Sequence, residues 1–400
     1  MTSRERVLAA LRHREPDRVP RDLGGTESSG MTATALLRLQ NHLGLPPDLR
    51  IFEPYQYVAT IGADLRQAFR IDTLNLTPAP RRWTTRLNPL GFEVSLPELW
   101  VEEDGPDGST VIRRSDGTVA ARRPQGGWYF DPVNPPLREV TDPAQLRHHD
   151  AAIRSFDYPS FADETLSDLA ARARAMHDTG GCVVFNLCCH LLAAGQLLCG
   201  FEEFMMHLLT DEVLVRSLLD RLVEGYLERI ARLAPLLRGC VDVVLLNDDL
   251  GTQNGPMLAP ATYRKLIKPY QKTLFANVRA SFGTPILFHS CGAVRDVIPD
   301  LIEVGVDALN PVQLSAVGME PKALKRDFGK DITFWGGGVD TQAVLNASRP
   351  QGVKDAVRRS IQDLAPGGGF VFCQVHNIQP DVPPENVVAM FEALDEGGSY

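Results

Sequence analysis

The sequence contains no apolar run that approaches the ~18 residues needed to cross a bilayer, and no signal-type apolar core follows its first residues. It also has no excess of positive charge. The net charge is -9 and no basic stripe is interleaved with aromatic residues, which argues against general nucleic-acid binding. The seven cysteines are odd in number and widely spread, unlike a secreted disulfide framework. We therefore expect a cytoplasmic protein with reduced thiols that binds neither membranes nor nucleic acids.

What the sequence does contain is a regular alternation of apolar runs and helical patterns. A hydrophobic content of 44% with 23% charged residues is that of an ordinary globular protein with a large core. The strand-like runs cover residues 18–25, 71–77, 182–187, 240–249, 284–289, 306–313, 332–340 and 369–376. This alternation predicts an α/β fold, a (β/α)8 TIM barrel that forms a single domain over residues 1–400.

The segment 81–137 departs from this alternation. Residues Val111–Ala121 place a Ser-Asp-Gly-Thr turn between β-prone flanks, which predicts an antiparallel β-hairpin insertion near residues 81–137. A Gly/Pro-rich stretch follows and carries Trp128, Tyr129 and Phe130. These aromatics could form a lid over one end of the barrel, although packing against the fold is the commoner use of such side chains.

The apolar run at residues 284–289 leads into Phe288-His-Ser-Cys-Gly292. Its histidine and cysteine have the spacing of two metal ligands. In a strand, residues i and i+2 face the same way, so His289 and Cys291 could share one ion. Imidazole nitrogen and thiolate sulfur together suit zinc. The alternative is a core histidine beside a buried free cysteine.

The ends of the neighbouring strands favour the metal site. Active sites of such barrels lie at the carboxyl ends of the strands. Polar residues gather at those positions in this sequence: Asn247, Asp248 and Asp249 end one strand, and Asn310 and Gln313 end another. Because these strand ends converge on one cavity, ligands from several strands could bind the same ion.

These residues also lie in motifs of a known family. The segments Asn247-Asp-Asp-Leu-Gly-Thr-Gln253, Phe288-His-Ser-Cys-Gly292, Gly305-Val-Asp-Ala-Leu-Asn-Pro-Val-Gln313, Trp335-Gly-Gly-Gly-Val-Asp340 and Val375-His-Asn-Ile378 together resemble the uroporphyrinogen decarboxylase superfamily, most closely its branch of cobalamin-dependent (corrinoid) methyltransferases. The resemblance covers residues 180–395 well and the earlier part loosely. It implies a (β/α)8 barrel and is compatible with a homodimer.

The resemblance implies a zinc ion held by His289, Cys291 and a third ligand from the last strand. We favour His376 over Cys373 as this ligand, because the Ile-x-Pro-like residues that follow the ligand in the family match Asn377-Ile-Gln-Pro380. Cys373 would also face the other way in a regular strand. Asp248 or Asp249, at the end of the preceding strand, is expected as a fourth ligand or as the hydrogen-bond partner of a metal-bound imidazole. A helix-capping pair is an equally good interpretation of these carboxylates.

The resemblance also suggests roles for other strand-end residues. The expected catalytic residues are Asp248, Asp249 and His289, and the expected cofactor-binding residues are Asn310, Gln313, Gly336 and Gly337. The glycines would let a cofactor or substrate approach the backbone closely, although a tight βα turn explains them equally well.

The expected function is zinc-dependent methyl transfer between a methylated substrate or a thiol and a corrinoid. Zinc with an open coordination position lowers the pKa of a bound thiol or hydroxyl, or polarises a C–O bond. The cobalamin is expected on a partner corrinoid protein, because the sequence has no convincing Asp-x-His-x-x-Gly module. The other partner is a small-molecule methyl donor or acceptor.

Two alternatives remain open. The first is a decarboxylase of the uroporphyrinogen decarboxylase type. It is disfavoured because the family's Arg-Gln-Ala-Gly-Arg and Phe-Ser-Asp motifs are replaced by Arg18-Val-Pro-Arg-Asp-Leu-Gly-Gly25 and Leu74-Asn-Leu-Thr-Pro78, and because a polycarboxylate substrate needs a cationic cleft. The second is a non-catalytic barrel with a structural metal, which would have four protein ligands and no vacant position.

Overall fold

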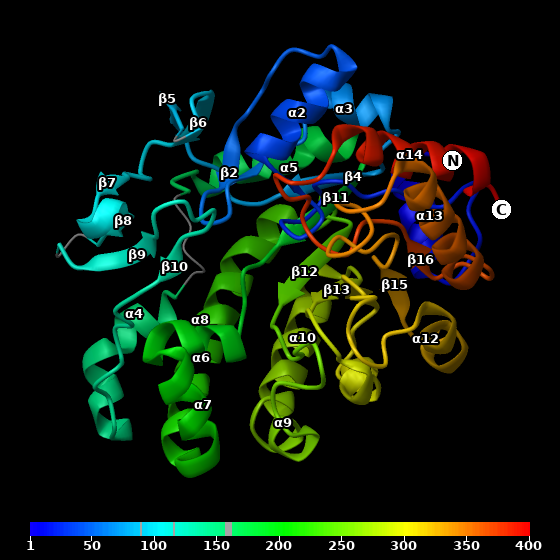
Figure 1. The fold of residues 1–400 in the computed structure, drawn as a ribbon. Helices are drawn as coiled ribbons and strands as arrows, with labels where there is room; N and C mark the ends of the chain where they lie inside the picture. Colours follow the sequence, from blue (N-terminus) through cyan, green and yellow to red (C-terminus); the bar gives the residue numbers. More distant parts are fainter. Residues whose placement is uncertain (89, 115–116, 157–161) are drawn as a thin grey trace.

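Parallel strands form one curled sheet at the centre of the molecule (Figure 1). The computed structural model describes residues 1–88, 90–114, 117–156 and 162–400. In the sheet, each strand pairs with its neighbours in the order β16-β15-β14-β13-β12-β11-β4. The strands are β4 (Thr73–Leu76), β11 (Cys182–Asn186), β12 (Val243–Asn247), β13 (Ile286–His289), β14 (Ala308–Asn310), β15 (Thr333–Trp335) and β16 (Phe370–Val371).

The gap between β4 and β16 is filled by residues 20–22, which close the barrel. The Asp22 N–H donates to the Phe372 carbonyl at 2.8 Å, and the Phe372 N–H donates to the Pro20 carbonyl at 2.9 Å. On the other side, the Asp72 N–H donates to the Arg21 carbonyl at 2.9 Å. The predicted (β/α)8 barrel is therefore confirmed. The predicted first strand over residues 18–25 is reduced to this short segment, because Pro20 has no N–H to donate to a ladder.

Alternate residues of the strands fall into two apolar clusters. Val184, Leu245, Leu287 and Ala308 belong to a cluster that also contains Val7, Ala10 and Leu11 of the first helix. Their sequence neighbours pack in the larger cluster with the outer helices. Both faces of the strands are thus buried, which explains why they read as continuous apolar runs.

Helices surround the sheet and follow its strands in turn (Figure 1). Three helices follow one another over residues 192–237, and Pro269 lies in the first turn of the helix Lys268–Phe282, close after the helix Pro260–Leu266. The helices are α1 (Ser3–Leu11), α2 (Ala33–Leu43), α3 (Ala63–Ala68), α4 (Asp150–Arg154), α5 (Leu166–Asp178), α6 (Leu192–Cys199), α7 (Phe201–Thr210), α8 (Glu212–Leu237), α9 (Pro260–Leu266), α10 (Lys268–Phe282), α11 (Ile298–Glu303), α12 (Pro321–Phe328), α13 (Pro350–Leu364) and α14 (Pro384–Gly397), with short 3-10 helices at Pro106–Gly108, Pro143–His149 and Arg295–Val297.

Within the described ranges, every helix is too short or too polar to cross a membrane. The cytoplasmic location stays a prediction.

The insertion at residues 81–137 contains more than the predicted hairpin. The hairpin itself is confirmed, since β8 pairs with β9 in antiparallel fashion, whereas residues 115–116 of its turn lie outside the described residues. Additional strands extend it to a four-stranded sheet, and a separate hairpin precedes it. The strands are β5 (Trp83–Leu87), β6 (Glu93–Pro97), β7 (Glu103–Asp104), β8 (Thr110–Arg113), β9 (Val119–Arg123) and β10 (Asp131–Pro132); a small sheet of β1 (Met31–Thr32), β2 (Ile51–Glu53) and β3 (Val58–Ala59) lies nearby in the fold.

The aromatics at the end of the insertion have different surroundings. Phe130 is buried and its ring meets that of Trp100 edge to face, with 5.1 Å between centroids. Trp128 and Tyr129 are exposed, and the Tyr129 hydroxyl hydrogen-bonds Gln379. Packing therefore accounts for Phe130, whereas a lid role for the other two stays a prediction.

A buried carboxylate joins the amino-terminal elements to the barrel. Asp72, whose side chain is fully buried, accepts hydrogen bonds from Arg6 Nη1 at 2.7 Å and Arg18 Nη1 at 2.8 Å. It also accepts the backbone N–H of Arg21 at 2.8 Å. One side chain thus links α1, the closing segment and the start of β4.

Candidate metal centre

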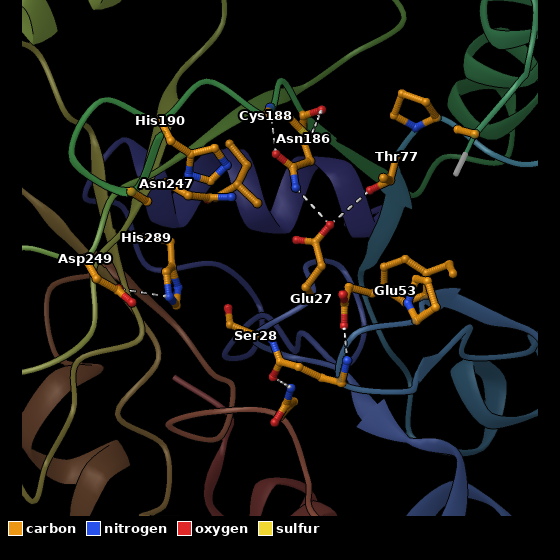
Figure 2. Close-up of a pocket in the computed structure, with 18 of the residues that line it drawn as sticks. Glu27, Ser28, Glu53, Thr77, Asn186, Cys188, His190, Asn247, Asp249 and His289 are labelled. Atoms are coloured by element: carbon orange, nitrogen blue, oxygen red, sulfur yellow. Dashed lines mark hydrogen bonds and ion pairs between the residues drawn. The ribbon is translucent and has the colours of Figure 1, made fainter. Parts of the chain in front are cut away.

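A cavity of about 260 Å³ opens at the carboxyl ends of the barrel strands. Figure 2 shows side chains from several strand ends and loops converging on it. Its wall includes Glu27, Glu53, Asn247, Asp249, His289 and His376. The position is the one expected for an active site in a barrel of this kind.

Three potential metal ligands lie together, and two of them, Asp249 and His289, line this cavity. Asp249, His289 and Cys291 each offer a ligand atom within 4.8 Å of the others. His289 Nε2 lies 3.5 Å from Cys291 Sγ and 3.7 Å from Asp249 Oδ1. A tetrahedral zinc ion holds its nitrogen and sulfur ligands about 3.5 Å apart, given Zn–N of about 2.05 Å and Zn–S of about 2.3 Å. The nitrogen and sulfur are therefore already spaced to fit zinc.

Asn310 sets the orientation of the His289 ring. Its Nδ2 donates to the Trp335 carbonyl at 2.9 Å, so its Oδ1 is an acceptor, and this oxygen lies 2.6 Å from His289 Nδ1. Ser28 Oγ donates to the same oxygen at 2.8 Å. Because His289 must then donate from Nδ1, its Nε2 keeps a lone pair directed at the cluster. A polar partner behind a metal-binding histidine is a common feature of metal sites.

Cys291 is positioned by two loops that pack backbone against backbone. Its N–H donates to Asp249 Oδ1 at 2.8 Å, and the next N–H, that of Gly292, donates to Gln313 Oε1 at 2.8 Å. Gly292 has φ +89°, and a Cβ there would lie 2.4 Å from the carbonyl carbon of Gly251. Only glycine fits this approach. Gln313 thus supports the turn, and its predicted contact with a cofactor stays a prediction.

The electrostatics of the cluster favour a bound cation. Burial, followed by the Asp249 carboxylate, raises the pKa of the Cys291 thiol well above its usual range. A thiolate beside a carboxylate is unfavourable unless a positive ion neutralises both, and a metal ion reverses this pKa shift. The donor set, with nitrogen, sulfur and oxygen ligands, suits zinc.

The two ligands predicted from the last strand lie in different places. His376 faces the cavity, with 6.5 Å between its ring centroid and that of His289, and its Nδ1 lies 2.9 Å from Asn377 Oδ1. Cys373 is fully buried, and its Sγ lies 3.6 Å from Asn310 Nδ2. In the described part of the chain, neither belongs to the compact donor group, whose third member is Asp249 instead.

The adjacent aspartates have separate roles. Asp248 accepts the N–H groups of Leu191, Leu192 and Ala193 at 2.8–3.0 Å, at the start of α6. Burial raises the pKa of this carboxyl to about 6. Asp248 therefore has the helix-capping contacts considered above, and Asp249, whose side chain is 52% exposed, is the carboxylate beside His289.

The predicted cofactor-binding glycines pack against the protein itself. A Cβ on Gly336 would lie 2.0 Å from the Pro311 carbonyl oxygen, and one on Gly337 would lie 3.2 Å from Val312. Both have positive φ. A tight turn against the segment after β14 is enough to require glycine at position 336, and a cofactor contact stays a prediction.

Sequence reasoning missed two glutamates in the cavity wall. Glu27 follows the segment that closes the barrel, so its place after a strand end was a usable signal. Glu53, at the end of β2, comes from outside the barrel and had no such signal. His190, which follows β11, also lines the cavity, and burial lowers its pKa to about 4.

Glu53 should make stability depend on pH. Burial raises the pKa of its carboxyl from 4.5 to about 7, so the folded protein binds the carboxyl proton more tightly than the unfolded chain does. The stabilisation of the fold that this proton provides is present at low pH and is lost as the pH rises from about 4.5 through 7. Relative to Glu53→Gln, the unfolding free energy of the wild type should fall by about 2 kcal/mol between pH 5 and pH 8. Urea unfolding of both proteins tests this, and parallel pH profiles would contradict it.

Comparisons with known proteins agree with this fold. A family model described as uroporphyrinogen decarboxylase (URO-D) matches residues 136–397. The uroporphyrinogen decarboxylase of Thermus thermophilus is 27% identical over 147 residues, 35% of this chain and 38% of that protein. That of Legionella pneumophila is 26% identical over 218 residues, 53% of this chain and 56% of that protein. The matched stretch thus spans little more than half of these relatives at most.

A solved structure extends the likeness in fold to nearly the whole chain. The methyltransferase from Methanosarcina mazei is 16% identical, covers 99% of both chains and has a TM-score of 0.59. At this identity the match shows a shared fold and no more. The family model, however, covers well over half of the sequence. The chain therefore belongs to the uroporphyrinogen decarboxylase (URO-D) family.

Proposed function

We propose that this protein is a zinc-dependent methyltransferase that moves a methyl group between a small methylated compound or a thiol and a corrinoid carried by a partner protein. The observation that carries the proposal is the group formed by Asp249, His289 and Cys291 at the cavity. Three protein ligands with one side open to a cavity are typical of catalytic zinc, whereas structural zinc has four protein ligands.

In this proposal zinc would be held by His289 Nε2, Cys291 Sγ and an Asp249 oxygen. When bound, zinc lowers the pKa of a thiol or hydroxyl, or polarises a C–O bond. Asn310 keeps the imidazole in the required tautomer through the 2.6 Å contact with Nδ1. His376 is proposed as a proton acceptor beside the centre, which leaves the fourth coordination position open. Burial lowers the pKa of His376, so its imidazole remains neutral and can accept a proton from the substrate.

The charge of the cavity supports methyl transfer over decarboxylation of a porphyrinogen. Among its described lining residues are Glu27, Glu53, Asp248 and Asp249, without an arginine or lysine. A polycarboxylate would bring further negative charge to a wall that offers no cation, which is costly in a partly desolvated site. The curated relatives are named decarboxylases, so this alternative is included in the test.

The test compares two reactions of the zinc-loaded protein. Methylcob(III)alamin is incubated with 2-mercaptoethanol, and its absorbance spectrum reports loss of the methyl group. Separately, uroporphyrinogen is incubated with the protein, and its products are separated by carboxylate number. We expect zinc-dependent demethylation that Cys291→Ser abolishes, and unchanged uroporphyrinogen. Loss of carboxylates from uroporphyrinogen in the metal-free protein would overturn the proposal, and so would demethylation that is equally fast without zinc.

A further inference from the structure

A second cavity, of about 400 Å³, adjoins the cavity of the metal centre. It lies between the barrel strand β4 and the helices α3 and α5, which are on the same side of the molecule in Figure 1. Its described lining residues do not include Asp249, His289 or Cys291, and the two cavities share a wall formed by Phe52, Thr77, Pro78 and Pro80. A compound bound in the second cavity is therefore separate from the compound that reacts at the metal centre.

The charged groups of this second cavity are both arginines. Arg66 and Arg172 belong to its described lining, which contains no aspartate or glutamate. Arg172 is already paired: its Nε and Nη2 donate to the two carboxylate oxygens of Glu164 at 2.9 Å and 2.7 Å, and Nη2 also donates to the Thr77 carbonyl at 2.7 Å. The charge that remains unbalanced in the cavity is that of Arg66.

Arg66 lies in α3 and has one hydrogen-bond partner in the described part of the chain, the Ile61 carbonyl, which accepts from Nη1. Its Nε and Nη2 donate to no described residue, and neither atom is buried. These two atoms form the edge of the guanidinium that binds a carboxylate through two parallel hydrogen bonds. Arg172 uses the same edge to bind Glu164, whereas the edge of Arg66 is vacant.

The partial burial of Arg66 makes an unpaired charge costly. Burial lowers the pKa of its guanidinium, and no carboxylate offsets this effect. Arg21 shows the usual arrangement, because burial lowers its pKa too but the Asp395 carboxylate, 2.6 Å away, opposes the shift. An arginine stays protonated in a protein, so an anion from outside the chain is what can neutralise Arg66.

The rest of the lining limits which anion fits. It is uncharged and carries large apolar side chains, among them Phe52, Leu74, Trp83 and Met176. A single vacant guanidinium edge balances one negative charge, which matches a carboxylate better than a doubly charged phosphate. The apolar side chains match an apolar body attached to that carboxylate.

We infer that the second cavity is a binding site for a small monocarboxylate with an apolar body. Its carboxylate accepts hydrogen bonds from Nε and Nη2 of Arg66, and its body lies among the apolar side chains of the wall. The inference depends on this cavity alone and requires neither zinc nor methyl transfer.

The test compares benzoate with benzamide, which has nearly the same shape and no charge. Their dissociation constants for the protein as purified are measured by ligand-observed NMR titration at low ionic strength. We expect benzoate to bind at least about tenfold more tightly than benzamide. The net charge of -9 repels benzoate, so general attraction to the protein cannot produce this order. Equal affinities, or no binding of benzoate at millimolar concentrations, would overturn the inference.

Variants locate the binding. Arg66→Gln should weaken benzoate binding by about tenfold and leave benzamide binding unchanged. Arg359→Gln, which removes an equal charge from an exposed position of α13, is the matched control and should change neither. A folded Arg66→Gln variant that still prefers benzoate would refute the site. Should that variant not fold, Ala175→Trp fills the cavity from an exposed position of α5, and undiminished benzoate binding there would refute the site equally.

A last variant separates this site from the metal centre. Because Cys291 does not line the second cavity, Cys291→Ser should keep the preference for benzoate. A preference that disappears in this variant would place the anion at the metal and overturn the inference, while leaving the proposed methyl transfer intact. Conversely, a preference for benzoate in a protein that does not demethylate methylcobalamin supports the carboxylate site and removes the methyltransferase.

Discussion

Replacing His289 with alanine or Cys291 with serine should weaken zinc binding on the order of 100-fold. The wild type, purified without an affinity tag, is expected to hold about one zinc ion per chain. Structural zinc sites bind with about 10–16 kcal/mol in total, so the loss of one ligand costs about 3 kcal/mol, or on the order of 100-fold in affinity. Elemental analysis gives the zinc content, and competition with a chromophoric chelator gives the affinity. Methyl transfer should fall with zinc occupancy in both variants when free zinc is only just sufficient to load the wild type, because the weakened sites then stay largely empty.

A matched control uses Cys373, a second cysteine near the ends of the strands. Cys373→Ser makes the same change as Cys291→Ser at a thiol outside the compact donor group, and it should retain zinc. Asn310→Ala should weaken zinc about 10- to 100-fold, because it removes the partner of His289 Nδ1. The ligand assignment is wrong if Cys373→Ser loses zinc as completely as Cys291→Ser, or if the wild type takes up none on reconstitution.

Replacing Asp72 with alanine should destabilise the fold more than most single substitutions. The change leaves Arg6 and Arg18 near a buried position without the carboxylate that pairs with both. Breaking a buried ion pair by removing one partner costs about 3–5 kcal/mol. That is a large part of the 5–15 kcal/mol by which domains are typically stable. Urea unfolding followed by circular dichroism measures the loss, and near-normal stability would show that the arginines find other partners.

The control for this prediction shares one of the arginines. Asp17 also accepts hydrogen bonds from Arg6, at 2.6 Å and 2.8 Å, but its side chain is 44% exposed. Water screens an exposed ion pair, so Asp17→Ala should cost only about 0–1 kcal/mol. Equal losses in the Asp17 and Asp72 variants would mean that burial does not set the size of the effect.

The barrel strands could be predicted from the sequence because both of their faces are buried. Runs such as Cys182–Asn186 and Val243–Asn247 are continuously apolar, and each ends in polar residues at the cavity. The i, i+2 rule placed His289 and Cys291 together, as the structure has them. The first strand was predicted over residues 18–25, and its true length could not be read from the sequence, since the closing segment at residues 20–22 is defined by hydrogen bonds to distant parts of the chain.

The sequence alone could not decide which of two neighbouring aspartates lies beside the metal ligands. Consecutive residues of an extended chain point in opposite directions, so the direction of one residue decides whether Asp248 or Asp249 meets His289. Here three N–H groups at the start of α6 hold Asp248. The contact between Gly251 and Gly292 then brings the two loops together, which places Asp249 beside Cys291. Both effects depend on pairing between segments far apart in the chain.

The closing segment also sets an order of events during synthesis. Arg21 lies beside Phe372 in the barrel, so a ribosome must extend the chain as far as Phe372 before this segment can meet its second neighbour. Residues near the start of the protein therefore wait longest for their final contacts, while the later strands can already pair with each other. A nascent chain halted before residue 370 would expose the edges of the closing segment and of β15, and such unpaired edges promote aggregation. Synthesis of residues 370–372 is thus the step that allows both edges to be covered.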